Sequence, residues 1–154
     1  MKNIKSITLV LLSIFTLVQI SGCKKSGGSS KPISEVLRAI FFAQQVKHDN
    51  TVVYTKGAAS NTVSGYSKFR MDLSSTTSVA FTDFDGTTFN GTYSLSGGSL
   101  VLSGLTPVPT GSGGTITFNV VSFQESPAQV VLTRAGSSVK TGNTTNEYTL
   151  TTTP

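Results

Sequence analysis

Side chains that could do chemistry are few in this sequence, and its single cysteine is the most informative of them. Cys23 offers one strong thiol nucleophile, suited to thioether formation, and it follows an apolar run over residues 7–20. Lys2 and Lys5 precede that run. A basic start, an apolar segment of about 7–15 residues and a small-residue cleavage site are typical of a secretory signal peptide. The run is short for a permanent membrane span, which needs about 20 apolar residues, so we expect residues 1–22 to be a cleaved leader.

The four residues that end at this cysteine, Ile20-Ser21-Gly22-Cys23, resemble the lipobox of bacterial lipoproteins. In that family the thiol is diacylated, the leader is cut before the cysteine, and the new amino terminus is acylated as well. One acyl chain holds a membrane only marginally, at about 0.8 kcal/mol per buried methylene, so several chains make the anchor durable. The resemblance implies that Cys23 is a lipidation site. Two alternatives stay open: an uncleaved helix with a chance cysteine, and an ordinary signal peptide with a free thiol.

The only histidine and one pair of aspartates are the other candidates for a catalytic or metal-binding site. His48 stands beside Asp49, but a catalytic histidine also needs a nucleophile and a metal site needs further ligands. An exposed turn residue is therefore the favoured interpretation of His48. Asp83 and Asp85 could bind calcium or act as an acid pair, but Asp-Gly is a strong hairpin signal and favours a turn-capping role. We predict that the protein is not an enzyme and uses no cofactor and no metal.

The distribution of charge argues against a nucleic-acid-binding protein. The net charge is +5, but five of the twelve basic residues precede residue 32. From residue 32 onward, seven basic residues face seven acidic ones. Recognition of nucleic acid needs a basic surface, so no nucleic-acid partner is predicted. We expect residues 23–31 to hold the lipidated cysteine and a flexible tether, because residues 26–30 are only serine and glycine.

Residues 32–154 are predicted to form one all-β domain. They lack tryptophan, carry little charge and are rich in threonine, serine, glycine and valine, which favours strands and turns. Turn signals separate about eight to nine alternating polar and apolar stretches, at intervals of about 8–12 residues. The clearest lies over residues 87–104, where Gly97-Gly98 predicts a two-residue hairpin turn, and another covers residues 66–73. Only residues 35–40 look helical. The pattern predicts an antiparallel β-barrel or sandwich.

Three segments are similar to the lipocalin-like lipoproteins of Bacteroidota: NGTYSLSGGSLVLSG, DNTVVYTKG and GYSKFRMDL. The resemblance covers about residues 41–134, and it implies a lipocalin-like, up-and-down barrel with a cup for a ligand. Lipocalins proper place a tryptophan at the start of the first strand and stack a late arginine on it. This chain has no tryptophan. Phe41 or Phe42 would have to fill that space, and Arg134 is the candidate for the arginine.

The inward positions of the expected strands define which side chains a ligand would meet. They are apolar or aromatic, and we expect them to line the barrel interior: Phe69, Met71, Phe81, Phe89, Tyr93, Leu100, Phe118 and Leu132. An eight-stranded barrel has room for its own side chains or for one small ligand. Two functions therefore stay open. One is a lipid-anchored module that binds a small apolar ligand; the other is a structural or protein- or glycan-interaction module with a filled core.

The predicted location is the cell envelope, with the lipid on Cys23 as the contact with the membrane. Lys24 stands where an aspartate retains lipoproteins in the inner membrane of enterobacteria, so the resemblance implies the outer membrane. The sequence after Cys23 has no acidic run of the kind that marks surface export in Bacteroidota, which favours the periplasmic face. The sequence identifies no protein partner.

Overall fold

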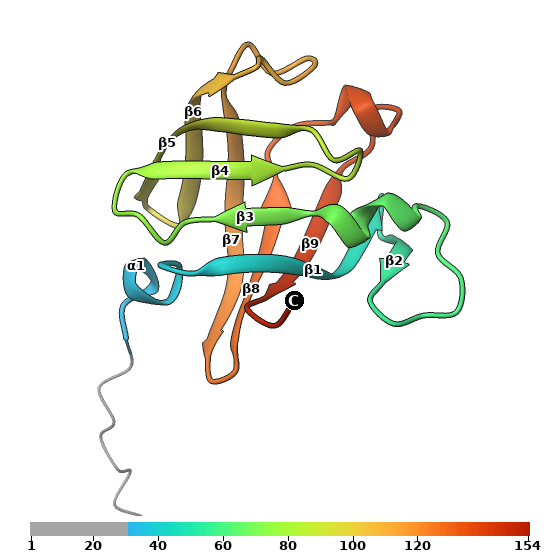
Figure 1. The fold of residues 1–154 in the computed structure, drawn as a ribbon, viewed down its shortest axis with the longest axis horizontal. Coiled ribbons are helices and arrows are strands. Elements are labelled where there is room, and N and C mark those ends of the chain that lie inside the picture. Colours follow the sequence, from blue (N-terminus) through green and yellow to red (C-terminus); the bar gives the residue numbers. More distant parts are fainter. Residues whose placement is uncertain (1–30) are drawn as a thin grey trace, which may run out of the picture.

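The computed structural model describes residues 31–154, so the expected leader and Cys23 lie outside the described residues. The described chain forms one antiparallel sheet of nine strands (Figure 1). The strands are β1 (Ile40–His48), β2 (Thr51–Thr55), β3 (Arg70–Asp72), β4 (Ser78–Thr82), β5 (Thr88–Ser96), β6 (Ser99–Thr106), β7 (Ile116–Glu125), β8 (Ala128–Arg134) and β9 (Asn146–Thr151). Three short helical turns accompany them: α1 (Ile33–Val36), η1 (Ser64–Lys68) and η2 (Val139–Thr141).

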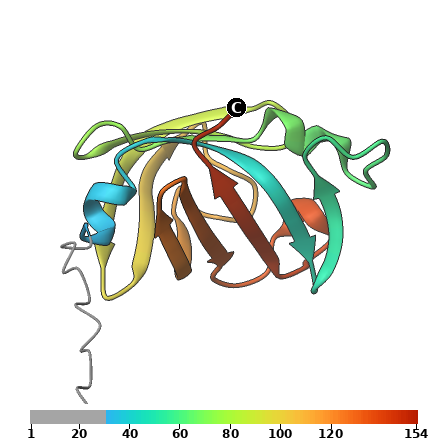
Figure 2. The same ribbon diagram turned by 90° about the horizontal axis from the view of Figure 1, so that it is seen from below.

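The sheet closes into a barrel because the first strand pairs with the last. β1 pairs with β9 along one edge, and on its other edge it pairs first with β3 and then with β2. Strands β3 to β9 each pair with the next in sequence, so eight strands close the barrel and β2 is an extra strand. Figure 2 shows the sheet curving round on itself. The predicted all-β, antiparallel up-and-down barrel of eight to nine strands is confirmed.

The hairpin turns form where the sequence supplies residues that tolerate positive φ angles. Asp49 and Asn50 have φ values of 46° and 67° between β1 and β2. Gly97 and Gly98 have φ values of 56° and 79° between β5 and β6, as the Gly-Gly pair predicts. Positive φ at both central residues gives a turn whose twist matches that of the two strands it joins. The register of these hairpins therefore follows from local chemistry.

One predicted strand is wrong over its first half. Residues 66–73 alternate in sequence, but the segment begins as the 3₁₀ turn η1, and only Arg70–Asp72 pair as β3. The turn buries both Tyr66 and Phe69, whose ring centroids lie 6.3 Å apart. In an extended strand, residues three positions apart point to opposite faces of the sheet, so a strand would bury only one of these two rings, whereas the turn buries both. The predicted helix is also shorter and earlier than residues 35–40, since α1 is a single turn ending at Val36.

The connections gather at two opposite ends of the barrel. We call one the mouth: it holds η1, the β4–β5 turn, the β6–β7 loop and the segment 135–145 that contains η2. We call the other the closed end: it holds α1, which contacts β7, and the β7–β8 turn. The backbone N–H of Lys31 donates to Glu125 Oε1 at 2.6 Å, so the described chain begins at the closed end. Within residues 31–154 no helix is long and apolar enough to cross a membrane.

Candidate functional site

The side chains predicted to line the barrel interior meet one another there. Seven of the eight are at most 3 % exposed and belong to one hydrophobic core: Phe69, Met71, Phe81, Phe89, Leu100, Phe118 and Leu132. Tyr93 is half-buried and packs against this core. Its hydroxyl donates to the carbonyl oxygen of Ser75 at 2.7 Å, which fixes the loop after β3. The strand alternation therefore identified the inward faces correctly.

Aromatic rings from opposite parts of the sheet contact each other across the barrel. Phe69 stacks on Tyr148 with centroids 5.1 Å apart, and it meets Phe81 edge-on at 5.4 Å. Phe118 lies 5.8 Å from Tyr148 and 6.4 Å from Phe81. Rings at these separations are in contact, so the four side chains occupy the space that a ligand would need. Tyr148 was not among the predicted lining residues, although it supplies the centre of this arrangement.

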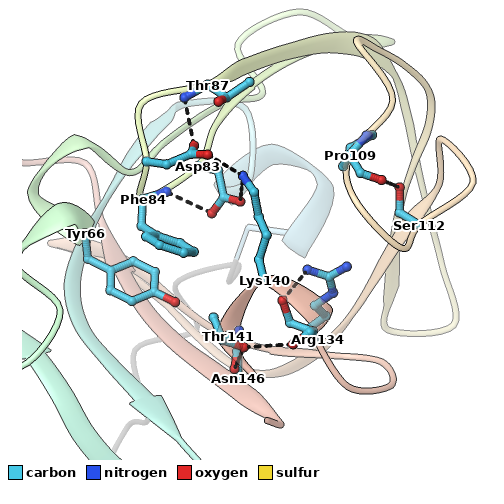
Figure 3. Close-up of polar contacts among 12 residues, drawn as sticks. Tyr66, Asp83, Phe84, Thr87, Pro109, Ser112, Arg134, Lys140, Thr141 and Asn146 are labelled. Atoms are coloured by element: carbon cyan, nitrogen blue, oxygen red, sulfur yellow. Dashed lines mark hydrogen bonds and ion pairs between the residues drawn. The ribbon is translucent and has the colours of Figure 1, made fainter. Parts of the chain in front are cut away.

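A polar cluster lies at the mouth, where its Tyr66 contacts Phe69 and Tyr148 of this aromatic interior. We call Tyr66, Asp83, Phe84, Asp85 and Lys140 the mouth cluster; Figure 3 labels all of these residues except Asp85. Lys140 Nζ donates to Asp83 Oδ2 at 3.1 Å and to Asp85 Oδ2 at 2.7 Å. The same ammonium lies 5.6 Å from the centroid of the Phe84 ring. One lysine from η2 thereby joins the segment 135–145 to the β4–β5 turn.

The β4–β5 turn holds both carboxylates in place through backbone hydrogen bonds. The backbone N–H of Phe84 donates to Asp83 Oδ1 at 2.8 Å, and that of Thr87 donates to Asp85 Oδ1 at 2.9 Å. The predicted turn-capping role of the two aspartates is confirmed by these contacts. The pKa of Asp85 is lowered to about 2, mainly by the hydrogen bond from Lys140 and next by that from the backbone N–H of Thr87.

Lys140 is presented by a compact loop of small polar residues. Ser138 pairs with Thr144 as an isolated bridge, and Gly142 ends η2 with a left-handed φ of 77°. Burial lowers the pKa of Lys140, but the hydrogen bonds to Asp85 and Asp83 outweigh it and leave the pKa raised. Sequence reasoning missed this lysine, because it stands 55 and 57 positions after its partners in a loop without any motif.

The mouth cluster continues to the single histidine through a tyrosine. His48 Nε2 and the Tyr66 hydroxyl share a hydrogen bond of 2.8 Å, and the Tyr66 ring lies 5.1 Å from that of Phe84. His48 is half-buried, so its interpretation as an exposed turn residue is wrong. It ends β1 rather than entering the turn, and Tyr66 covers it. Burial lowers the pKa of His48, opposed in part by the charge of Asp49.

The candidate arginine does not take the place that the lipocalin resemblance implies. Arg134 ends β8 at the mouth, where its Nη1 donates to Ser138 Oγ at 3.2 Å. Phe41, which is fully buried, lies near the start of β1 at the closed end, and Phe42 is half-buried on the opposite face of that strand. Because β1 starts and β8 ends at opposite ends of the barrel, the structure does not bring Arg134 to either ring.

The polar groups of the mouth cluster are paired with one another or with His48, and these contacts join η1, the β4–β5 turn and the segment 135–145 to their neighbours. Both aspartates are engaged by Lys140, and the Tyr66 hydroxyl is engaged by His48. Burial, above all, raises the pKa of Tyr66 far above its ordinary value, so this hydroxyl stays protonated. Within residues 31–154, no group of three His, Cys, Asp or Glu side chains is arranged to hold a metal ion.

The comparisons with known proteins add no family to this description. No family model matches the chain, and neither the curated proteins nor the solved structures contain a significant match to it.

Proposed function

We propose that this protein is a lipid-anchored envelope protein whose barrel is a packed scaffold that presents its mouth to a protein or glycan partner. The observation that carries the proposal is the contact of Phe69, Phe81, Phe118 and Tyr148 across the interior. A barrel of eight strands holds either its own side chains or one small ligand. Rings that touch each other at its centre favour the first of these two uses.

The expected orientation of the barrel relative to its lipid anchor supports this role. The described chain begins beside Glu125 at the closed end, eight residues after the expected lipidation site Cys23. An anchor on that cysteine therefore draws the closed end toward the bilayer and leaves the mouth facing away from it. The mouth carries the polar groups and the exposed side chains of Val108 and Val139, which a partner would meet first.

The anchor is tested by mass spectrometry of the protein purified from its host membrane. The proposal expects a chain that starts at Cys23, with a diacylglyceryl group on its sulfur and an acyl group on its amino terminus. It also implies the outer membrane, with the domain on the periplasmic face. Recovery of the intact leader with a free thiol would contradict the anchor.

The partner is tested by photo-crosslinking in the native envelope. A photoreactive residue at Val139 samples the mouth, and one at Thr76, which is exposed in the β3–β4 turn at the closed end, is the control. We expect one partner to be recovered reproducibly from the Val139 position and not from Thr76. Equal, unselective labelling at both positions would count against a mouth-directed partner.

Binding of a small apolar ligand is the second candidate, and one feature favours it. Lys140 Nζ lies 5.5 Å from the Phe89 ring as well as near Phe84, so opening of the segment 135–145 would uncover an aromatic surface. Extraction of the host-purified protein with organic solvent tests this candidate. A stoichiometric lipid in the extract, absent from a Phe89→Glu variant, would support it.

A further inference from the structure

We infer that the closed end carries a small apolar surface that rests on the lipid bilayer. We call it the closed-end patch and define it by Ile33 of α1 with Val120, Val121 and Phe123 of β7. These side chains line a surface depression of about 440 Å³, together with Gly98 and Ser122. The inference rests on the proposed lipid anchor for its orientation. It adds a second contact with the membrane, made by the folded domain itself.

The patch is exposed where a folded domain would normally bury such side chains. Val121 is 59 % exposed and Phe123 is 44 % exposed, and they are two of the five large apolar side chains exposed within residues 31–154. Phe123 pairs with Val130, which is fully buried, so Phe123 continues the inward face of β7 past the end of the core. β7 therefore continues its apolar inward face past the part of the barrel in which neighbouring side chains bury that face.

Local structure holds the patch in this shape. The pairing of β7 with β8 slips between Val120 and Ser122, which marks a bulge at Val121. Bulges bend a strand and re-aim its side chains. The backbone N–H of Val120 donates to the carbonyl oxygen of Gly98 at 2.8 Å, and this bond ties the β5–β6 turn to the bulge. The patch is thus built on two anchored hairpins rather than on a loose loop.

The length of chain before the patch identifies the bilayer as its occupant. Lys31 stands eight positions after Cys23, and eight residues span at most about 29 Å when fully extended. Lys31 is fixed beside Glu125 by its backbone hydrogen bond, and Ile33 follows two residues later. A lipid on Cys23 therefore keeps the patch within reach of the membrane surface. In the sequence, Lys24, Lys25 and Lys31 precede Ile33 by two to nine positions, and their positive charge suits anionic headgroups.

The size of the patch also argues against a second copy of the chain as its occupant. A stable protein interface uses about 20–30 residues on each side, whereas the depression is lined by six residues. A bilayer sets no such requirement, because the apolar face of a protein element enters the headgroup boundary to a depth of about 5–10 Å without a complementary protein surface. Phe123 and Val121 are suited to that depth.

The test uses the absence of tryptophan from this sequence. Residues 23–154, the proposed mature chain, are coupled through the Cys23 thiol to a maleimide lipid in phosphatidylcholine vesicles, with or without brominated acyl chains. Every residue of the described core lies between Leu37 and Leu150, so removal of the leader takes nothing from that core. Phe123→Trp places a reporter at the patch, and Val108→Trp places one at the mouth on a side chain that is 67 % exposed. Circular dichroism checks that both variants keep the barrel.

We expect brominated lipid to quench the Phe123→Trp emission by about half or more, since insertion to about 5–10 Å brings the ring among the acyl chains. The Val108→Trp emission should stay unchanged. Adding Val121→Asp to the Phe123→Trp variant should restore most of the lost emission, and adding Val52→Asp should not. Failure of the Phe123→Trp variant to be quenched on fully coupled vesicles would overturn the inference.

Two other outcomes would overturn it as well. Equal quenching of both reporters would mean that the barrel has no fixed orientation. A blue-shifted but unquenched Phe123→Trp emission, with dimers trapped by cross-linking, would assign the patch to a second copy. Because the lipid is coupled chemically, each result stands whether or not the host acylates Cys23. Failure of the closed-end patch and failure of the natural anchor are therefore distinguished.

Discussion

Lys140 Nζ lies 2.7 Å from Asp85 Oδ2, and this contact joins two segments of the mouth that are 55 positions apart in sequence. The same ammonium reaches the more buried carboxylate of Asp83 at 3.1 Å. The segment 135–145 is thereby held over the Phe84 and Phe89 rings. One cation therefore links the segment 135–145 to the β4–β5 turn.

Lys140→Met should therefore lower the free energy of unfolding by about 1–2 kcal/mol, because it leaves the Asp83 carboxylate buried without its cation. The matched control is Lys47→Met, which breaks the 2.8 Å pair between Lys47 and Glu147, where both side chains are about one-third exposed. Exposed pairs contribute about 0–1 kcal/mol, so this variant should lose less. Urea denaturation measures both losses. Equal losses of unfolding free energy in the two variants would show that the ion pairs of Lys140 stabilise the fold no more than an exposed pair does.

The contribution of the mouth to stability should also decrease in acid, over a pH range that is set by the pKa of Asp85. Its pKa falls from 3.8 in the unfolded chain to about 2 in the folded one. A lowered carboxylate pKa stabilises the fold fully above the unfolded value, and this contribution is lost as the pH falls from about 4 toward 2. The Asp85 side chain is 40 % exposed, so solvent screening keeps the effect modest.

Urea denaturation at pH values between 2 and 6 measures this contribution. The difference in stability between the wild type and Lys140→Met should shrink as the pH falls through that range. A difference that stays constant down to pH 2 would mean that Lys140 does not depend on the charge of Asp85.

His48 should titrate below its ordinary pKa of 6.5, because burial disfavours its charged form more than Asp49 favours it. When a folded histidine has a lowered pKa, the unfolded chain binds the proton first, so stability falls as the pH drops through 6.5. As the only histidine, it gives one NMR signal to follow. Tyr66→Phe removes the hydroxyl that meets His48 Nε2 and should cost about 0.5–1.5 kcal/mol. A His48 pKa above 6.5 would contradict the burial described here.

The close approach of η1 to the β4–β5 turn predicts a sensitive glycine. A Cβ atom on Gly65 would lie closer to the carbonyl oxygen of Phe84 than real Cβ atoms come to any neighbour. Gly65→Ala should therefore push the two segments apart and cost about 1–3 kcal/mol. Ser67→Ala, on an exposed position of the same turn, should stay within about 0.5 kcal/mol. Thermal unfolding of the two variants makes the comparison, and a tolerated Gly65→Ala would show that the segments separate freely.

The barrel could be predicted from sequence to the extent that local chemistry determines it. Alternation assigned Met71, Leu100 and Phe118 to the inward face, because successive residues of a strand point to opposite faces. The Gly97-Gly98 pair located its hairpin, because glycine accepts positive φ. These features depend only on neighbours along the chain.

The mouth could not be predicted in the same way, because its contacts join distant segments. The alternation of residues 66–73 suggested a strand, but the burial of Tyr66 against the rings of Phe84 and Tyr148 bends the chain into η1. Lys140 carries no motif that would point to Asp83. The turn η1 and the Lys140 contact form only when segments that are distant in sequence pack together in the closed barrel.

The packed interior is tested most directly by titrating the wild type and a Phe118→Ala variant with a small apolar fluorophore. Removal of the Phe118 ring should cost about 3–5 kcal/mol and leave an apolar cavity, and such cavities bind small apolar molecules. If the barrel is a filled scaffold, the wild type shows no saturable binding and the variant binds one fluorophore per chain. Saturable, one-to-one binding by the wild type, displaced by a fatty acid, would contradict it.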